Sequence, residues 1–208
     1  MAETRRSYDA VAARYAAEFR TELDGKPLDR ALLGLVVELA AGGLIADVGA
    51  GPGLITDHLA RLGGHAVAVD LSPAMCALAP APAVCADMAR RPLGTASVSA
   101  VVCFYAVIHL DPGGRAHAYA EFARVLRPGG HALVAFHVSD PEHGPGETVE
   151  RSEWWGEHVD LVFRFLSPDE EADALARAGL PVTARVDRSP YPGVEHPSRR
   201  AYLLAQRP

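Results

Sequence analysis

The sequence of 208 residues predicts a doubly wound α/β fold, in which a mostly parallel sheet has helices on both faces. Apolar strand-like runs alternate with segments whose apolar residues recur at helical spacing. The run at 98–105 is almost wholly apolar, as expected of a strand that is buried on both faces. The last two runs are joined by a turn alone, which predicts a closing antiparallel strand pair at the C-terminal end.

The first half of the chain begins with two helical patterns. Apolar residues at helical spacing predict helices at 4–19 and 28–41, and Gly42-Gly43 ends the second. Short apolar runs then predict strands at 44–49, 65–70 and 82–87, each of which carries an acid at or near its end. Helices are expected between them at 53–62 and 72–79; the second starts with Ser72-Pro73, the favoured order of cap and proline.

The second half continues the alternation and brings the number of expected strands to seven. After the strand at 98–105 we expect a helix at 114–126, a strand at 131–138, a helix at 168–178, and strands at 181–187 and 199–206. Residues 139–160 are polar, rich in His and Trp, and fit no regular element. Because they follow a strand end, where open parallel sheets bind ligands, we expect a loop insertion on the substrate side. One domain over 1–208 is expected, with residues 1–41 as a helical cap.

Composition excludes several classes of protein. The 20 basic and 26 acidic residues give a net charge of −6, which disfavours a nucleic-acid partner and an anionic membrane surface. Three cysteines without a CxxC motif indicate neither a disulfide framework nor a cysteine zinc site. The N-terminus lacks the apolar core of a signal peptide, and the longest apolar run, 98–110, is too short to span a bilayer. We therefore expect a cytoplasmic protein; pairing of two copies is compatible with the sequence.

A glycine loop with the sequence DVGAGPG, residues 47–53, joins the first strand of the sheet to its helix. Its spacing is G-x-G-x-G, and Leu54 stands where a dinucleotide fingerprint has its third glycine. Asp47 before the loop also disfavours a pyrophosphate and favours a cationic or zwitterionic ligand. Asp70 could accept hydrogen bonds from a ribose diol, and Asp87 from an adenine amine. Taken alone, either acid could equally be a solvated residue at a strand end or a helix cap. The glycine loop taken alone could equally be a turn between strand and helix that binds no ligand.

Together these pieces resemble the class I S-adenosylmethionine-dependent methyltransferases, small bacterial members above all. The matching segments are DVGAGPG (47–53), VAVDLS (67–72), CADM (85–88), VVCFYAVIHL (101–110) and RVLRPGGHALVAF (124–136). They follow the order typical of the family and cover roughly residues 44–138. The resemblance implies a Rossmann-like seven-stranded sheet, S-adenosylmethionine as cofactor, S-adenosylhomocysteine as product, and a role in specialised metabolism.

The resemblance also implies roles for individual residues. Gly49, Ala50, Gly51 and Gly53 would wrap the methionine part, and Asp47 would anchor their loop and help to hold the ammonium group. Asp70 would bind the ribose and Leu71 would pack on the adenine, with Asp87 and the Met88 backbone serving the adenine edge. The Phe104 carbonyl would face the ammonium, and Tyr8 and Tyr15 would cover the cofactor; a plain helix stripe explains Tyr15 as well.

Two histidines are candidates for the base that activates a methyl acceptor. His109 follows the fourth strand and His137 ends the fifth, so both should open onto the catalytic edge. Asp111 could orient His109 or simply cap the next helix. His137, His143 and His158 have no recognised metal-ligand spacing, and we expect no metal. His158 and His196 fit surface or structural positions.

The segment 139–160 supplies the candidate substrate contacts. His143, Trp154 and Trp155 lie in it, and aromatic side chains on a lid often hold an apolar or planar substrate. Either tryptophan could instead attach the loop to the core. Arg151, Arg164 and Arg188 fit solvated surface charges.

The leading hypothesis is methyl transfer to a hydroxyl or amine of a small molecule, by in-line displacement. Nucleobase-amine methyltransferases usually carry an Asn/Asp-Pro-Pro-aromatic motif after the fourth strand, where this chain has Phe104-Tyr105-Ala106-Val107. The alternatives are a nicotinamide-dependent oxidoreductase on a related fold and a protein of the same fold that binds S-adenosylmethionine without transferring its methyl group.

Overall fold

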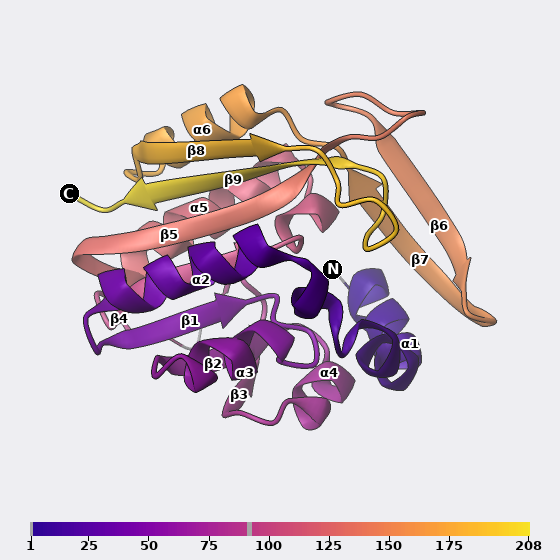
Figure 1. Ribbon diagram of the computed structural model, residues 1–208, viewed down its shortest axis with the longest axis horizontal. Coiled ribbons are helices and arrows are strands. Elements are labelled where there is room, and N and C mark those ends of the chain that lie inside the picture. Colours follow the sequence, from indigo (N-terminus) through magenta and orange to yellow (C-terminus); the bar gives the residue numbers. More distant parts are fainter. Residues whose placement is uncertain (1, 91–92) are drawn as a thin grey trace.

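Seven strands form one sheet in the computed structural model, which describes residues 2–90 and 93–208 (Figure 1). Their order across the sheet is β3-β2-β1-β4-β5-β9-β8. The bounds are β1 Leu44–Val48, β2 His65–Asp70, β3 Ala83–Cys85, β4 Val98–Phe104, β5 Leu126–Ser139, β8 Val182–Arg188 and β9 Arg199–Gln206. The pairs from β3 to β5 are parallel, whereas β9 runs antiparallel to both β5 and β8. This confirms the predicted fold class, including the closing antiparallel strand.

Helices cover both faces of the sheet. They are α1 Ala2–Phe19, α2 Pro27–Ala40, α3 Leu54–Arg61, α4 Pro73–Leu78, α5 Pro112–Val125 and α6 Pro168–Arg177, with short 3-10 turns η1 Glu22–Gly25 and η2 Val107–His109. Alternate residues of a strand point to opposite faces, so β4 sends Ala100 and Val102 to the α2/α3 side and Val101 and Cys103 to the α5/α6 side. All seven residues of β4 are buried, as its apolar sequence predicts.

Residues 139–160, expected to lack regular structure, form most of a β-hairpin instead. The two strands are β6, Thr148–Trp154, and β7, Glu157–Arg164, and Trp154 pairs with Glu157. The two-residue turn between them, Trp155-Gly156, has positive φ at both positions (56° and 86°). Such turns match the twist of the flanking strands, so the hairpin closes tightly. The expectation of a loop insertion is therefore wrong in its secondary structure.

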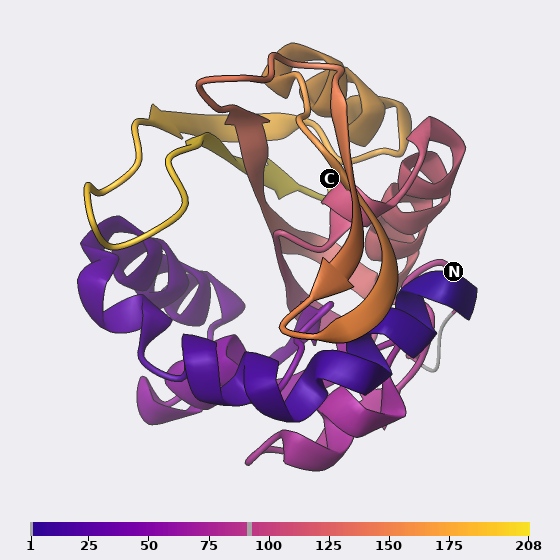
Figure 2. The ribbon, with the colours of Figure 1, turned by 90° about the vertical axis from the view of Figure 1, so that its right-hand side faces the viewer.

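The hairpin packs on α1, and together they form a layer beyond the carboxyl ends of the parallel strands (Figure 2). Val11 of α1 and Val159 and Leu161 of β7 are buried against each other. Ser7 on α1 accepts a hydrogen bond from the Asp160 backbone N–H at 2.8 Å. Helix α2, the second half of the expected helical cap, packs on the sheet itself. The expected cap starts at Met1, outside the described part of the chain.

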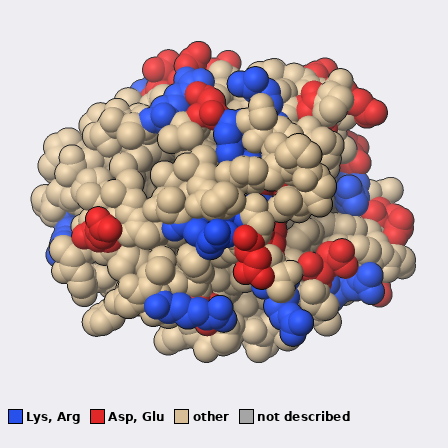
Figure 3. Space-filling view, in the orientation of Figure 1, with Lys and Arg blue, Asp and Glu red and all other residues tan. Residues whose placement is uncertain are grey.

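Lysine and arginine side chains alternate with acidic ones on the face shown in Figure 3. This face therefore carries no broad patch of one sign. None of the described helices combines the length and the apolar character that a membrane crossing needs.

Candidate active site

A cavity of about 1370 Å³ opens at the carboxyl ends of β1, β2, β4 and β5. Its lining includes the glycine loop, α1, the hairpin, η1 and the loop between β8 and β9. Most single-ligand pockets enclose about 300–1,000 Å³, so this cavity has room for more than one small molecule. Residues from positions 4 to 200 contribute to it, and the fold brings both halves of the chain to one site.

The glycine loop turns sharply under one wall of the cavity. Gly49, Gly51 and Gly53 all have positive φ, which costs glycine little. A Cβ atom at Gly49 would lie 2.2 Å from the Cβ of Ala106, so a side chain there cannot fit without movement. The backbone N–H of Gly49 donates to the Val69 carbonyl at 2.8 Å, which ties the loop to the end of β2. Ala50 and Gly51, which follow this turn, both line the cavity.

Asp70 ends β2 and faces the cavity. Its Oδ2 accepts a hydrogen bond from the Gly51 N–H at 2.7 Å, and its Oδ1 accepts one from the Ser72 N–H at 2.8 Å. Burial raises the pKa of this carboxyl, against the lowering effect of those two hydrogen bonds. A carboxylate has about four lone pairs, so Asp70 can still accept from the two hydroxyls of a ribose.

Asp47 and Asp87 do not line the cavity. Asp47 is buried beneath the loop, where the Thr56 hydroxyl donates to it at 2.6 Å and burial raises its pKa to about 7. Asp47 therefore holds the start of α3 against β1. This position is consistent with the expected role of Asp47 as an anchor for the glycine loop. Asp87 Oδ1 accepts from the Ala89 N–H at 2.9 Å, as in a local turn.

Most of the other predicted cofactor residues do come together. Leu71, Met88, Phe104, Tyr8 and Tyr15 all line the cavity. The rings of Tyr8 and Tyr15 meet edge to face, 6.0 Å apart, on one side of α1. An acidic acceptor, the glycine loop and apolar and aromatic walls thus lie in one place. This set fits an adenosyl amino acid.

His109 lies in η2 and is held between α1 and the hairpin. Its Nδ1 lies 2.9 Å from the Val162 carbonyl, which can only accept, so Nδ1 carries the proton. Its Nε2 therefore accepts from the Tyr8 hydroxyl at 2.7 Å. Burial lowers the pKa of His109 to about 4. Asp111 caps α5 by accepting from the Gly114 N–H at 2.7 Å, so its interpretation as a cap holds.

His137, near the end of β5, has one ring nitrogen free of protein contacts. Nδ1 hydrogen-bonds the Ser198 hydroxyl at 2.7 Å, and the ring stacks on Tyr105 at 4.9 Å. Nε2 has no hydrogen-bond partner among residues 2–90 and 93–208. Burial lowers the pKa of His137 to about 3, and Arg200, His196 and Lys26 add to the effect. The imidazole is therefore neutral at physiological pH.

The expected substrate residues divide between the cavity and its surroundings. Trp154 and His143 line the cavity, and His143 stacks on Phe165 at 5.4 Å while bonding Asp140 at 3.0 Å. Trp155 lies outside the lining and stacks on Trp154 at 4.5 Å, so it supports its neighbour rather than facing the cavity. His196, expected at a surface or structural position, is exposed but also lines the cavity.

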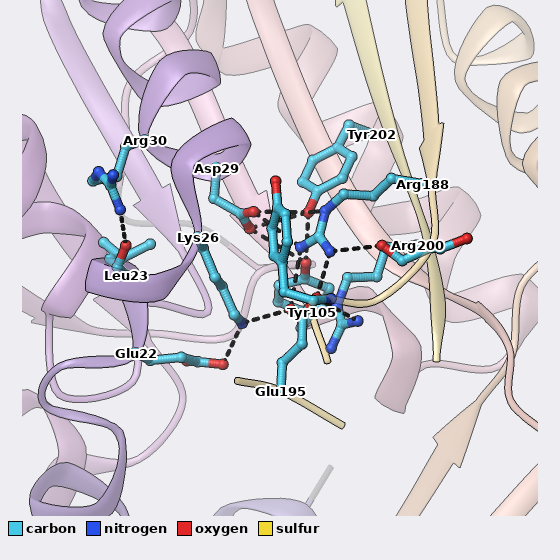
Figure 4. A network of polar contacts seen from close by, with 12 residues as sticks. Glu22, Leu23, Lys26, Asp29, Arg30, Tyr105, Arg188, Glu195, Arg200 and Tyr202 are labelled. Atoms are coloured by element: carbon cyan, nitrogen blue, oxygen red, sulfur yellow. Dashed lines mark hydrogen bonds and ion pairs between the residues drawn. The ribbon is translucent and has the colours of Figure 1, made fainter. Parts of the chain in front are cut away.

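A buried ionic network at one end of the cavity has no counterpart in the sequence analysis (Figure 4). Glu195, in the β8–β9 loop, contacts three cations: Arg188, Arg200 at 3.1 Å and Lys26 at 3.4 Å. Arg188 also binds Asp29 at 3.0 Å, so its interpretation as a solvated surface charge is wrong. Burial raises the pKa of Glu195, but its bonds to Arg188 and the Tyr191 N–H outweigh this and bring it to about 2.

The network joins segments that are far apart in the sequence. Tyr202 on β9 donates to Asp29 on α2 at 3.0 Å, and Tyr105 lies 3.1 Å from the Tyr202 hydroxyl. Tyr105 follows β4 with a φ of 57°, a rare conformation for a residue with a side chain. In the described part of the chain, His, Cys, Asp and Glu side chains form no group of three that could hold a metal ion.

Comparison with protein families matches residues 46–134 to a methyltransferase domain. Among curated proteins, the biotin biosynthesis bifunctional protein BioHC of Cellvibrio japonicus is 29% identical over 191 residues, which are 87% of this chain and 34% of that protein. The chain spans only about a third to a half of the length of the first curated relatives that it matches.

Two solved structures share the fold over almost the whole chain. A methyltransferase of Haloferax volcanii, in complex with its activator Trm112, covers 99% of this chain and 97% of its own, with a TM-score of 0.72 and 20% identity. The 1,6-didemethyltoxoflavin-N1-methyltransferase of Burkholderia thailandensis, with its substrate and S-adenosylhomocysteine bound, covers 94% and 90%, with a TM-score of 0.67 and 20% identity. At this identity the likeness concerns the fold.

Proposed function

Because residues 46–134 match a methyltransferase domain, we propose that the chain is a class I S-adenosylmethionine-dependent methyltransferase that transfers a methyl group to a hydroxyl or amine of a small molecule. The observation that carries the proposal is the cavity, which the glycine loop, Asp70, His137 and Trp154 line together. S-adenosylmethionine supplies an electrophilic methyl group on a sulfonium. The protein has to bind this cofactor, orient an acceptor in line with the methyl group, and keep water out.

The residues around the glycine loop would hold the cofactor. Asp70 would accept from the ribose hydroxyls, and Leu71 and Met88 would contact the adenine. The Gly49–Gly53 backbone would follow the methionine part, while Tyr8 and Tyr15 on α1 would cover it. Asp47 would keep the loop in place from below, since it is buried and bonded to Thr56.

A small planar acceptor suits the remainder of the cavity. Its walls there include the rings of Trp154, Phe163, Phe165, Tyr105 and His143. The relative with bound 1,6-didemethyltoxoflavin acts on a small heterocycle within the same fold, which supports an acceptor of that size. The net charge of −6 argues against a nucleic-acid substrate.

His137 would orient a neutral acceptor, because its Nε2 is free to accept a hydrogen bond from a hydroxyl or amine, whereas the Nε2 lone pair of His109 is engaged by Tyr8. With its pKa lowered to about 3, His137 is only a weak base. We therefore assign His109 to positioning: it links the end of β4 to α1 and the hairpin. His143 and Trp154 would contact the acceptor.

Calorimetric titration with S-adenosylmethionine, S-adenosylhomocysteine and NADH tests the cofactor. We expect micromolar binding of the first two and none of NADH. Asp70→Asn should weaken S-adenosylhomocysteine at least tenfold, since charge-assisted bonds to the ribose become neutral ones. Asp173→Asn, at an exposed position on α6, is the matched control and should bind like the unmodified protein.

Other outcomes of this titration contradict the proposal in different ways. Binding of NADH alone would identify a nicotinamide-dependent oxidoreductase. Binding of S-adenosylmethionine without methyl transfer to any member of an acceptor panel would identify a binding protein of the same fold. Full affinity in a folded Asp70→Asn protein would remove Asp70 from the cofactor site.

A further inference from the structure

The end of the cavity between η1 and the β8–β9 loop carries two buried cations. Lys26 and Arg200 are each only 2% exposed, and both line the cavity. Arg200 lies directly opposite His137 in the antiparallel β5–β9 pair, so their side chains leave the sheet on the same face. Charged residues are seldom buried in proteins without a partner for each charge. The partners of Lys26 and of Arg200 therefore indicate whether a ligand could complete their interactions.

The carboxylates near these two cations form ion pairs with an arginine that lies outside the cavity lining. Arg188, which does not line the cavity, binds both Glu195 and Asp29. The Tyr202 hydroxyl also donates to Asp29, where it lies between the two carboxylate oxygens at 3.1 and 3.0 Å. Glu22 contacts Lys26 from the rim, where 33% of its side chain is exposed and water weakens the pair.

The Nε–H of Arg200 is unused within the described part of the protein. Its Nη1 donates to the Ser198 carbonyl at 2.7 Å and also contacts Glu195, and its Nη2 donates to the His196 carbonyl at 3.2 Å. Its Nε is buried and has no hydrogen-bond partner in the described part of the chain. A buried N–H without a partner is costly, so the guanidinium of Arg200 is not fully satisfied by the described residues, and Arg200 is one of the residues that line the cavity.

We propose that this end of the cavity binds a carboxylate of the methyl acceptor, with the guanidinium of Arg200 and the ammonium of Lys26 as donors and His196 on its open side. The inference rests on the proposed function and names its substrate class: a planar aromatic acid. The ring of such an acid has the stacked Tyr105 and His137 beside it. A cationic acceptor fits poorly, because Arg200, His196 and Lys26 already disfavour a positive charge on the neighbouring His137.

Three fragments of one shape test the charge preference. 2-Naphthoate, 2-naphthamide and 2-naphthylmethylamine are titrated calorimetrically into the protein saturated with S-adenosylhomocysteine. We expect the carboxylate to bind at least tenfold more tightly than the amide, and the amine to bind most weakly. Arg200→Gln should bring carboxylate and amide within about threefold of each other, whereas Arg200→Lys should keep most of the preference.

Arg199→Gln removes a neighbouring but exposed charge and should leave the preference unchanged. Where Arg200→Gln does not fold, the fragment series on the unmodified protein and on His196→Ala decides. Equal binding of carboxylate and amide, tighter binding of the amine, or no binding of the carboxylate would each overturn the inference. Failure of the proposed function is seen separately, as absence of S-adenosylhomocysteine binding; the fragments are then titrated into the protein alone.

Discussion

His109 and His137 stand at adjacent strand ends, yet their surroundings give them different chemistry. Both are kept neutral by burial, with pKa values lowered to about 4 and about 3. The proton on His109 is fixed by the Val162 carbonyl, and its lone pair is used by Tyr8. His137 keeps Nε2 free. Position in the sequence made the two equivalent, and only their contacts separate a histidine that can accept a hydrogen bond from a ligand from one whose two ring nitrogens are both used.

Their lowered pKa values predict acid sensitivity. An unfolded histidine binds a proton below about pH 6.5, whereas the folded protein keeps these two neutral until about pH 4 and 3. Between those values the unfolded state binds more protons, so stability falls as the pH falls. We expect the melting temperature to drop from pH 7 to pH 5, and to drop less in His137→Gln.

His117→Gln, at an exposed site on α5, is the control and should keep the full drop. Asp47 has the opposite effect on the pH dependence of stability. Its pKa is raised to about 7, so its contribution to the free energy of unfolding falls as the pH rises from about 4 to 7. The comparison of His137→Gln with the unmodified protein cancels that effect. Equal pH slopes in the two proteins would show that His137 titrates normally.

The predictable part of the site is local in sequence. The glycine loop, Asp70 and Leu71 lie next to the strands that position them, so their spacing was enough. Lys26 and Arg200 could not be found in this way, because their burial depends on Glu195 and on a loop that closes from the far end of the chain. Arginine and lysine are usually solvated, and the sequence alone gives no sign of a distant carboxylate.

Among the elements, the β6–β7 hairpin is the one that the sequence did not predict. Most residues of β6 are exposed, so no alternation of apolar residues marks it. In β7 only Val159 and Leu161 are fully buried, and they face α1 rather than the sheet. The turn has tryptophan where asparagine or aspartate is usual. Because the alternation of apolar residues is weak and the turn residues are unusual, the sequence of this segment could not be distinguished from that of a loop.

This packing predicts that α1 and the hairpin open as one unit. Leu161→Ala removes a buried side chain from their contact and should destabilise this unit by about 2–5 kcal/mol. Hydrogen exchange should then quicken in residues 2–19 and 148–164, while β4 and β5 stay protected. Leu203→Ala, in the core of the sheet, should instead quicken exchange throughout. Loss of protection in β4 after Leu161→Ala would show that the layer does not open separately.

At the scale of the whole molecule, the layers follow from the sequence because apolar strand-like runs, such as that of the wholly buried β4, alternate with helical segments. The cavity is a property of the complete fold, since its walls come from α1, the glycine loop, β5 and the β8–β9 loop. A ligand that fills it therefore holds both halves of the sheet.

Ligand binding should accordingly stabilise the entire protein. S-adenosylhomocysteine at 100 times its Kd should add about 2.7 kcal/mol to the free energy of unfolding. For a chain of this size, that is a rise in melting temperature of about 5–10 °C, measured by thermal unfolding. NADH at the same concentration is the control and should cause no rise. An unchanged melting temperature at saturation would mean that the ligand does not bind the folded protein.

The place of β9 has a consequence for biosynthesis. Of the strands in this sheet, β9 is the last to be made, yet it lies inside the sheet, between β5 and β8. At 5–20 residues per second, a ribosome completes β9 roughly 3–13 s after β5. Until then the apolar edge of β5 has no partner, and unpaired edges attract other strands. We expect newly made chains to depend on chaperones during this interval, and chains interrupted before residue 199 to aggregate rather than fold.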